Sequence, residues 1–358
     1  MRFIYSLAIV FLGSLGTVHG DQLVLVAGGG TKTEGPAKEC KLNGPFAVDF
    51  DKAGNMYIAE FNGQRLLKVD PKGMLTVVAG TGEKGSGGDG GPGLKAQFNC
   101  MHHLAVGPDG AVYLADTFNN RIRKFDPKTG MVSAFAGTGK KGFSGDGGPA
   151  LEAEFGGIYS IAFDAKGERL YVTDLDNRRI RMIDMASGKV STVAGNGKRG
   201  VPEDRALAKD SPLVDPRAVA VDSKGRVYIL ERGGHALRVV GSKGKIRTVA
   251  GTGKAGATGD DGHPLRATLN GPKHLCIDRD DNVIIADTAN HVIRKYYPKR
   301  IVRIAGTGKK GKSGAGGDPL KTDLDEPHGV YVHPSGVLYI VDSFNDRVFK
   351  LEKGLIGN

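Results

Sequence analysis

The stretch IRTVAGTG, from Ile246 to Gly253, ends in a signature that returns along the whole chain. Related copies end at Gly30, Gly82, Gly139, Gly197 and Gly308. Successive copies are 52 to 58 residues apart. A period of this length is typical of solenoids and propellers, in which every repeat is one supersecondary unit. The repeat is therefore the unit from which the fold must be built.

Each repeat contains four short apolar strands in the same order. One repeat runs RAVAVD (Arg217 to Asp222), RVYILE (Arg226 to Glu231), ALRVVG and IRTVAG, with turns that contain glycine between most of the strands. Short runs that are rich in Val, Ile and Tyr and are bounded by glycine indicate β-strands. Six such units predict six four-stranded sheets.

The two ends of the repeat array complement each other. The last unit, which starts at Pro327, has three strands, whereas an unmatched fourth strand, LVLVAG (Leu23 to Gly28), precedes the first unit. Pairing the two would close a ring and leave no sheet edge exposed. We therefore predict an all-β fold, a six-bladed β-propeller of four-stranded blades that is closed by its N-terminal strand.

Two complete units carry a resemblance to a known repeat. They are DPRAVAVDSKGRVYILERGGHALRVVGSKGKIRTVAG and FNCMHHLAVGPDGAVYLADTFNNRIRKFDPKTGMVSAFAG. Both resemble NHL repeats, and the likeness extends over essentially the whole chain after residue 20. The resemblance implies a propeller. Propellers of this family include RNA-binding proteins, protein-interaction modules and lyases, so the fold does not assign a function.

The N-terminal residues differ from the repeats. Met1 to Gly20 contains a basic Arg2, the apolar run FIYSLAIVFLGSLG and small residues before Asp21. This pattern predicts a signal peptide over residues 1–20, and therefore export to the periplasm or the extracellular space. A single propeller domain over 21–358 follows. No other stretch is long and apolar enough for a membrane span, and we expect a monomer.

Composition narrows the chemistry of the partners. The formal net charge of +11 favours anionic partners, such as a small molecule, a polysaccharide or a protein. Few aromatic residues lie among the basic residues of the connectors, which argues against nucleic acid. Three cysteines are too few for a disulfide framework, and the pairing of Cys40 with Cys100 is left open. The basic connector residues are Lys84, Lys140, Lys141, Lys198, Arg199, Lys254, Lys309, Lys310 and Lys312.

Glycine-rich connectors join the blades, among them FSGDGGPALEAEF at residues 143–155. A phosphate-binding loop would need the pattern GxxxxGK[ST] between a strand and a helix; residues 306–313 (GTGKKGKS) match the letters but lie in a connector between two predicted strands, so no match in that context occurs. A calcium site would need several oxygen ligands, so calcium is an option only if main-chain carbonyls supply most of them. We interpret the connectors as turns that place Ala150, Ala153 and Phe155 against the core, with Cys40 as the counterpart of Ala153.

An acidic residue ends the second strand of every blade. An arginine follows five or seven residues later in all six blades. The hairpin places the two side chains opposite each other, which predicts a charge-assisted hydrogen bond. Because the pair recurs in every blade, we interpret it as structural. The six acids are Glu60, Asp116, Asp174, Glu231, Asp287 and Asp342.

At one set of equivalent positions, near the start of the first strand, the side chain differs between blades. Two residues after each of these positions, every blade has an apolar residue. Varied, mostly polar side chains at aligned positions are what a site on a symmetric scaffold should show. We predict that they bind a ligand at the mouth of the central channel. These six mouth residues are Phe46, His102, Tyr159, Arg217, Lys273 and His328.

Two mouth residues suggest a comparison with an enzyme. His102 and His328 fall in alternate blades, similar to the peptidyl-hydroxyglycine amidating lyases, propellers of this family in which three histidines from alternate blades bind zinc. The third position here is Arg217, which would repel a cation but can hold a carboxylate. His103 and His274, each next to a mouth position, are alternative ligands. His102 and His328 are thus candidate zinc ligands in an incomplete set.

The sequence favours a binding or scaffold module for an anionic ligand or protein partner at the channel mouth. The alternative is a lyase or hydrolase at the same place. No GxSxG nucleophile elbow occurs in the chain. The catalytic candidates of the alternative are His102, Tyr159, Arg217, Lys273 and His328.

Overall fold

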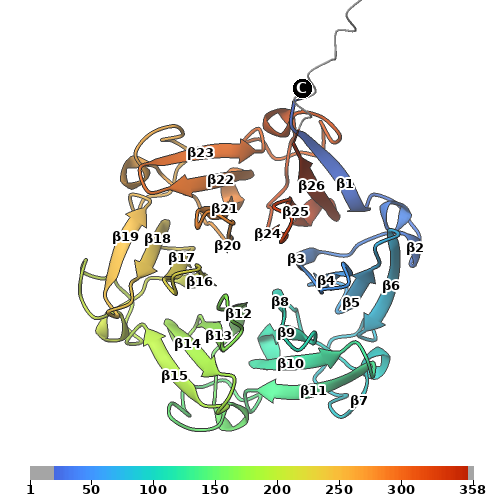
Figure 1. The fold of residues 1–358 in the computed structure, drawn as a ribbon, viewed down its shortest axis with the longest axis horizontal. Coiled ribbons are helices and arrows are strands. Elements are labelled where there is room, and N and C mark those ends of the chain that lie inside the picture. The colour runs from blue at the N-terminus through green and yellow to red at the C-terminus, as the bar shows by residue number, and fades with distance from the viewer. Residues whose placement is uncertain (1–19, 354–358) are drawn as a thin grey trace, which may run out of the picture.

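The repeats form a ring of six antiparallel sheets around a central axis (Figure 1). The computed structural model describes residues 20–353, and the predicted signal peptide lies outside them apart from Gly20. The innermost strands of neighbouring sheets contact each other around the axis. The prediction of a six-bladed β-propeller is confirmed.

The first three blades follow the predicted order of strands from the axis outward. Blade 1 contains β3 (Pro45–Phe50), β4 (Met56–Glu60), β5 (Leu66–Val69) and β6 (Met74–Ala79). Blade 2 contains β8 (His103–Val106), β9 (Val112–Asp116), β10 (Arg121–Asp126) and β11 (Met131–Ala136). Blade 3 contains β12 (Ile158–Phe163), β13 (Arg169–Asp174), β14 (Arg179–Asp184) and β15 (Val190–Ala194).

The other three blades repeat this order. Blade 4 contains β16 (Pro216–Val221), β17 (Val227–Glu231), β18 (Ala236–Val240) and β19 (Ile246–Ala250). Blade 5 contains β20 (His274–Ile277), β21 (Val283–Asp287), β22 (Val292–Tyr297) and β23 (Arg300–Ala305). Blade 6 contains β24 (Gly329–Val332), β25 (Leu338–Asp342), β26 (Arg347–Glu352) and β1 (Gln22–Gly28).

Short elements occupy the loops. Two-residue strands, β2 (Gly35–Pro36) and β7 (Gly91–Pro92), add a fifth strand to blades 1 and 2, which the sequence did not predict. Among the described residues no helix is long and apolar enough to cross a membrane. The connectors contain the 3-10 helices η1 (Ala37–Glu39), η2 (Gly93–Lys95), η4 (Ala150–Glu152), η5 (Ala208–Asp210), η6 (Pro264–Arg266) and η8 (Pro319–Lys321). The turns after second strands contain η3 (Thr117–Asn119), η7 (Thr288–Asn290) and η9 (Ser343–Asn345).

The ring is closed by pairing of its first and last strands. The N-terminal strand β1 pairs antiparallel with β26, with Gln22 opposite Glu352 and Gly28 opposite Arg347. In Figure 1 the two strands lie side by side at the outside of blade 6. Leu23 is fully buried in this blade. The predicted closure by the N-terminal strand is confirmed.

The acid–arginine pairs form in all six blades. They are short in blades 1, 4 and 6, where the nitrogen–oxygen distance is 2.7 Å, and lie between 3.3 and 3.9 Å in the others. Each carboxylate is fully buried and also accepts a hydrogen bond from a main-chain N–H that lies 17 or 18 residues earlier. Each of these amides lies three residues before a mouth residue. They belong to Asn43, Asn99, Gly156, Val214, Asn270 and Asp325.

A second link ties neighbouring blades together. The residue one or two positions before each third strand has a left-handed backbone conformation, with φ between 46° and 55°. In five blades its side chain accepts a main-chain N–H two residues before the mouth residue of the next blade, as Asn120 does from Gly157 at 3.0 Å. In blade 3 the residue is Arg178, which has no acceptor atom. Blade 4 therefore lacks this link at the residues that precede Arg217.

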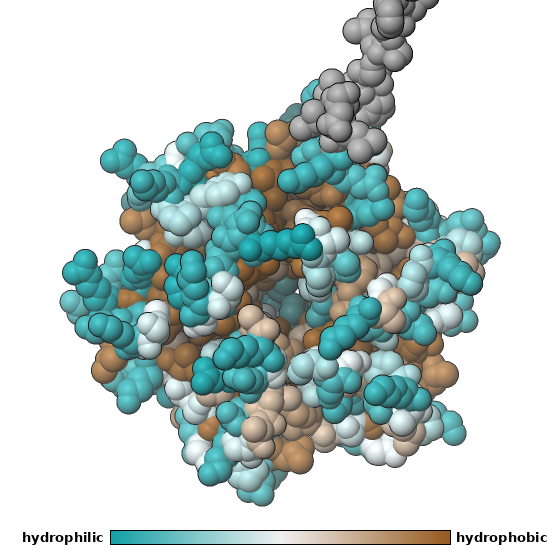
Figure 2. All heavy atoms as spheres, in the orientation of Figure 1, coloured by the Kyte–Doolittle hydropathy of each residue, from teal (hydrophilic) through white to brown (hydrophobic). Residues whose placement is uncertain are grey.

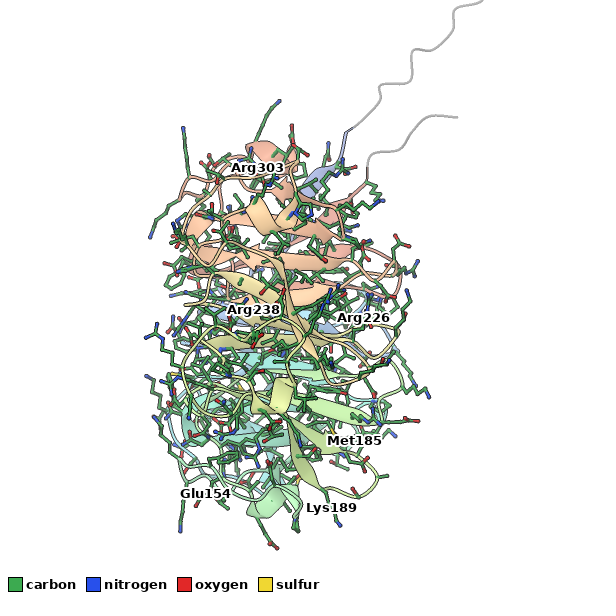
Figure 3. The ribbon with its side chains drawn as sticks, turned by 90° about the vertical axis from the view of Figure 1, so that its left-hand side faces the viewer. Glu154, Met185, Lys189, Arg226, Arg238 and Arg303 are labelled. Carbon is green, nitrogen blue, oxygen red and sulfur yellow. The ribbon has the colours of Figure 1, made fainter. Side chains whose placement is uncertain are left out.

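The connectors are structural, as predicted. Ala153 and Phe155 are fully buried, and a Cβ atom at Gly145 (φ +87°) would lie 2.6 Å from the Cα atom of Ala153, so the close approach requires glycine. The connector acids bind the arginines of the following blades: Arg123 to Asp89, Arg181 to Asp146 and Arg294 to Asp260, at 2.7–2.8 Å. Figure 3 shows the ring edge-on, and in it the labelled connector residue Glu154 and hairpin residue Arg226 lie toward opposite faces of the ring.

The core lies between the faces of adjacent blades. Tyr113 of blade 2, for example, belongs to one buried cluster with Leu170 and Val172 of blade 3. All three cysteines are free thiols, so Cys40 and Cys100 are not paired. Since no disulfide constrains this ring, its closure depends on strand pairing and apolar burial.

We expect Leu23→Ala to lower the free energy of unfolding by about 2–5 kcal/mol, because it leaves a cavity beneath the closing strand. Leu151→Ala, at a side chain that is 54% exposed on a connector, is the matched control and should change it by less than about 0.5 kcal/mol. Urea unfolding followed by circular dichroism measures both. Equal stabilities of the two variants would contradict the closure by β1.

Candidate functional site

The structure brings the mouth residues together at one end of the inner strands. Phe46, Tyr159 and Arg217 are in β3, β12 and β16, whereas His102, Lys273 and His328 directly precede β8, β20 and β24. The first four of the following contacts run continuously around the axis. Ring centroids are 4.0 Å apart for Phe46 and His328, 5.4 Å for Phe46 and His102, and 4.4 Å for His102 and Tyr159; Arg217 lies 4.0 Å above the Tyr159 ring, and Lys273 binds Glu326.

Three further phenylalanines extend the rings of the mouth. Phe61 stacks on Phe46 at 4.4 Å, Phe118 lies 5.8 Å from His102, and Phe344 lies 5.7 Å from His328. Phe118 and Phe344 are 48% and 54% exposed. Each of the three lies one or two residues after the buried acid that ends the second strand of its blade. The aromatic arc consists of Phe46, Phe61, His102, Phe118, Tyr159, His328 and Phe344.

Arg217 is the unusual charge of the site. Its side chain is 4% exposed, and its Nε and Nη1 atoms have no hydrogen-bond partner among the described residues. The nearby Asp215 instead accepts from Nε of Arg232 at 2.8 Å. Burial lowers the pKa of Arg217 to about 9, so the guanidinium is still charged at neutral pH. A buried charge without a hydrogen-bonded partner is costly, which makes this position a candidate for binding an anion.

His102 and His328 are neutral. Nδ1 of His102 lies 3.1 Å from the carbonyl oxygen of Cys100, and Nδ1 of His328 lies 2.8 Å from that of Glu326. A carbonyl only accepts, so both Nδ1 atoms carry the proton and both Nε2 atoms keep a lone pair. Burial, assisted by the charge of Arg217, holds the pKa of both histidines well below the usual value.

A second pair of histidines spans the axis below the mouth. His103 and His274 start β8 and β20, which face each other across the ring in Figure 1. Their Nε2 atoms lie 2.5 Å apart. Each Nδ1 lies 3.3–3.4 Å from a main-chain N–H of the next blade, that of Ile161 or Val330. In the histidine bridge (His103 and His274) one Nε2 atom donates and the other accepts, because a separation of 2.5 Å leaves room for one proton.

The donor set does not fit a zinc ion. Within residues 20–353, no three His, Cys, Asp or Glu residues are grouped as a metal site would require. Nε2 of His102 and His328 could each donate a lone pair, but the third position holds the cation of Arg217. The Nε2 atoms of the histidine bridge bind each other at 2.5 Å, which leaves neither of them free as a ligand. Calcium fits the connectors poorly, because three of their acids already bind arginine.

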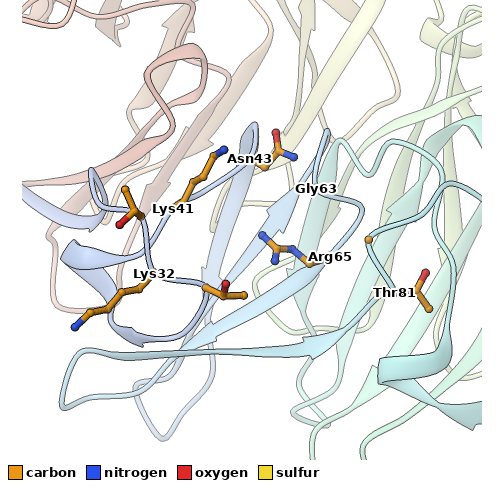
Figure 4. Close-up of a pocket in the computed structure, with 9 residues that line it drawn as sticks. Lys32, Lys41, Asn43, Gly63, Arg65 and Thr81 are labelled. Atoms are coloured by element: carbon orange, nitrogen blue, oxygen red, sulfur yellow. The ribbon is translucent and has the colours of Figure 1, made fainter.

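A separate surface pocket of about 340 Å³ lies near blade 1 (Figure 4). Lys32, Lys41 and Arg65 line it together with Thr81. Lys32 pairs with Glu39 at 2.5 Å, and Arg65 pairs with Glu60. None of the six mouth residues lines this pocket. The nine basic connector residues predicted from the sequence are all exposed, and Figure 2 shows many hydrophilic side chains around a central hollow on one face.

Comparison with known proteins supports the repeat assignment. The family model of the Teneurin NHL domain matches residues 150–258. The chain is 27% identical over 277 residues to "Protein SUPPRESSOR OF QUENCHING 1, chloroplastic" of Arabidopsis thaliana, which covers 72% of this chain and 26% of that protein. It is 24% identical to "NHL repeat-containing protein 2" of Bos taurus, over 86% of this chain and 46% of that protein. The chain thus spans less than half the length of these relatives.

Solved structures share the architecture at low identity. An auxiliary nutrient binding protein from Bacteroides ovatus superimposes with a TM-score of 0.68 and 16% identity, over 94% of this chain and 78% of that chain. Identity at this level shows a common fold and leaves the chemistry of the site to this chain's own residues.

We expect acid to destabilise the protein through the histidine bridge. Burial lowers the pKa of His103 to about 4 and that of His274 well below the usual value, whereas the unfolded chain takes up these protons near pH 6.5. Stability therefore falls as the pH drops from 6.5, by about 2 kcal/mol for His103 between pH 7 and pH 5, and His274 acts in the same direction. Urea unfolding at both pH values measures the loss.

The double variant His103→Gln/His274→Gln should lose at least about 2 kcal/mol less than the parent over the same interval, because neither glutamine titrates. The parent and the variant share all other titrating groups, so the difference isolates the pair. Identical pH dependence would contradict neutral, buried imidazoles at these positions.

Proposed function

We propose that this chain, a six-bladed propeller of NHL repeats, is a binding or scaffold module that takes an anionic ligand or protein partner at its channel mouth. The proposal is supported by the gathering of six different side chains at equivalent positions of an otherwise regular ring. The name of the Bacteroides ovatus structure, an auxiliary nutrient binding protein, is consistent with binding by this architecture.

The observation that carries the proposal is the unpartnered guanidinium of Arg217. In each acid–arginine pair of the blades, the arginine binds a carboxylate of its own chain, as Arg238 binds Glu231 at 2.7 Å. Among the described residues, Arg217 packs on the face of Tyr159, and its Nε and Nη1 atoms bind no acceptor. An anion would supply the missing acceptor, and a planar guanidinium favours a carboxylate or another oxyanion.

The wider surface supports an anionic partner. The exposed basic residues of the connectors lie on the same side of the blades as the loops that lead into the mouth. Such a field raises the rate of encounter with anions and weakens with salt. A small molecule, a polysaccharide or an acidic protein surface would each be attracted.

We also propose export of a monomeric propeller over residues 21–358 after removal of a signal peptide over residues 1–20. The composition of the first 20 residues supports this. Sequencing the N-terminus of protein recovered from the host's periplasm or medium would test it. A recovered chain that begins at Met1 would contradict removal.

A lyase or hydrolase at the same mouth is the second candidate function. The favouring observation is that His102 and His328 keep free Nε2 lone pairs beside a buried cation, as a general base needs. One zinc ion per purified chain that is lost in His102→Ala would favour this candidate over a pure binding module.

We expect Arg217→Met to raise the free energy of unfolding of the ligand-free protein by about 1–3 kcal/mol, because it removes an unpaired buried charge. Arg238→Met is the matched control. It breaks a buried pair and should lower the free energy of unfolding by about 3–5 kcal/mol. Urea unfolding measures both. If both variants destabilise the protein to the same extent, Arg217 is a structural residue, and the proposed ligand site is wrong.

A further inference from the structure

We propose that the ligand of the channel mouth is a monovalent carboxylate attached to a flat aromatic ring. This inference rests on the proposed function and names the class of ligand. It follows from the distribution of side chains around the axis, which divides the mouth into an aromatic side and a cationic side.

The aromatic side is a continuous series of rings from blades 6, 1, 2 and 3. Each member of the aromatic arc lies 4.0 to 6.4 Å from a neighbour by ring centroids. Phe118 and Phe344 remain about half exposed, whereas Phe46, His102 and His328 are buried. Exposed aromatic side chains are the usual anchors of a flat apolar ligand.

The cationic side comes from blades 4 and 5. Arg217 of blade 4 touches the end of the aromatic arc at Tyr159, and Lys273 of blade 5 follows it around the axis. The Lys273 ammonium is already bound to Glu326 at 2.9 Å. Arg217 is therefore the cation that a ligand would neutralise, and it lies 4.0 Å from the Tyr159 ring of the aromatic arc.

The histidine bridge leaves Arg217 as the donor that a ligand would meet. The Nε2 atoms of His103 and His274 already bind each other at 2.5 Å. Among the described residues, Nε and Nη1 of Arg217 have no acceptor. A planar guanidinium can hold a carboxylate through two parallel N–H···O bonds.

The same surroundings disfavour ligands of higher charge. Glu326 and Asp215 lie beside the cationic side, one bound to Lys273 and the other to Arg232. A phosphate dianion or a polyanion would bring at least two negative charges against a single free cation and close to these carboxylates. A single carboxylate balances Arg217 without excess.

The test uses three ring carboxylates as probes: benzoate, 2-naphthoate and indole-3-acetate. Calorimetry with the full chain compares them with acetate, 2-naphthol and inorganic phosphate. We expect at least one ring carboxylate to bind at least tenfold more tightly than all three comparison compounds. Arg217→Met should abolish this preference.

A double variant and a control variant test whether the exposed aromatic side chains of the mouth bind the ligand's ring. Phe118→Ala/Phe344→Ala removes two exposed rings and should weaken the best ring carboxylate by about tenfold, because each stacked ring contributes on the order of a threefold change in affinity. Phe143→Ala, at an exposed ring on a connector, is the control and should leave the affinity unchanged. Unfolding curves of these variants report that the fold is kept.

The outcomes distinguish this inference from the proposed function. Equal binding of acetate or phosphate that depends on Arg217 but not on Phe118 and Phe344 would overturn the ring carboxylate and leave an anion site. Binding of 2-naphthol as tight as that of 2-naphthoate would overturn the role of the charge. Failure of all the anions to bind in an Arg217-dependent way would overturn both.

Discussion

The buried carboxylate at the end of each second strand is the interaction on which the mouth depends. Asp116, for example, accepts from the amide of Asn99 at 2.7 Å and from the side chain of Asn119 at 2.8 Å, and it faces two arginines. One group thus holds the entry of the inner strand, the following turn and the third strand. Because the amide lies three residues before the mouth residue, the same contact fixes the place at which each mouth side chain begins.

A regular scaffold makes an irregular site possible. Every blade repeats the carboxylate anchor, so the side chain three residues on can vary without loss of the fold. Blade 4 departs furthest from the rule, since Arg178 replaces the acceptor that links the other blades and Arg217 follows without a partner. Departures of this kind cost stability, and they concentrate where a binding surface would benefit from unmet hydrogen-bonding capacity.

Local and periodic signals could be predicted from the sequence; contacts across the ring could not. The repeat gave the number of blades, the unmatched strand at Leu23 gave the closure, and alignment of the first strands gave the six mouth residues. The contact of His103 with His274 joins positions 171 residues apart and depends on the width of the ring. Phe118 and Phe344 were missed because their turns recur in every blade, which favours a structural interpretation of the whole turn.

The antiparallel closure of the ring has a mechanical consequence. Gln22 and Glu352, the outer ends of the paired strands β1 and β26, lie opposite each other. A force that pulls these two ends apart would break the hydrogen bonds between β1 and β26 one after another, starting at this end. It would not load all of these bonds together in shear. The remaining five blades have no free end to pull. Tension along the chain would therefore separate β1 from β26, at the outside of blade 6, before it loads the other five blades.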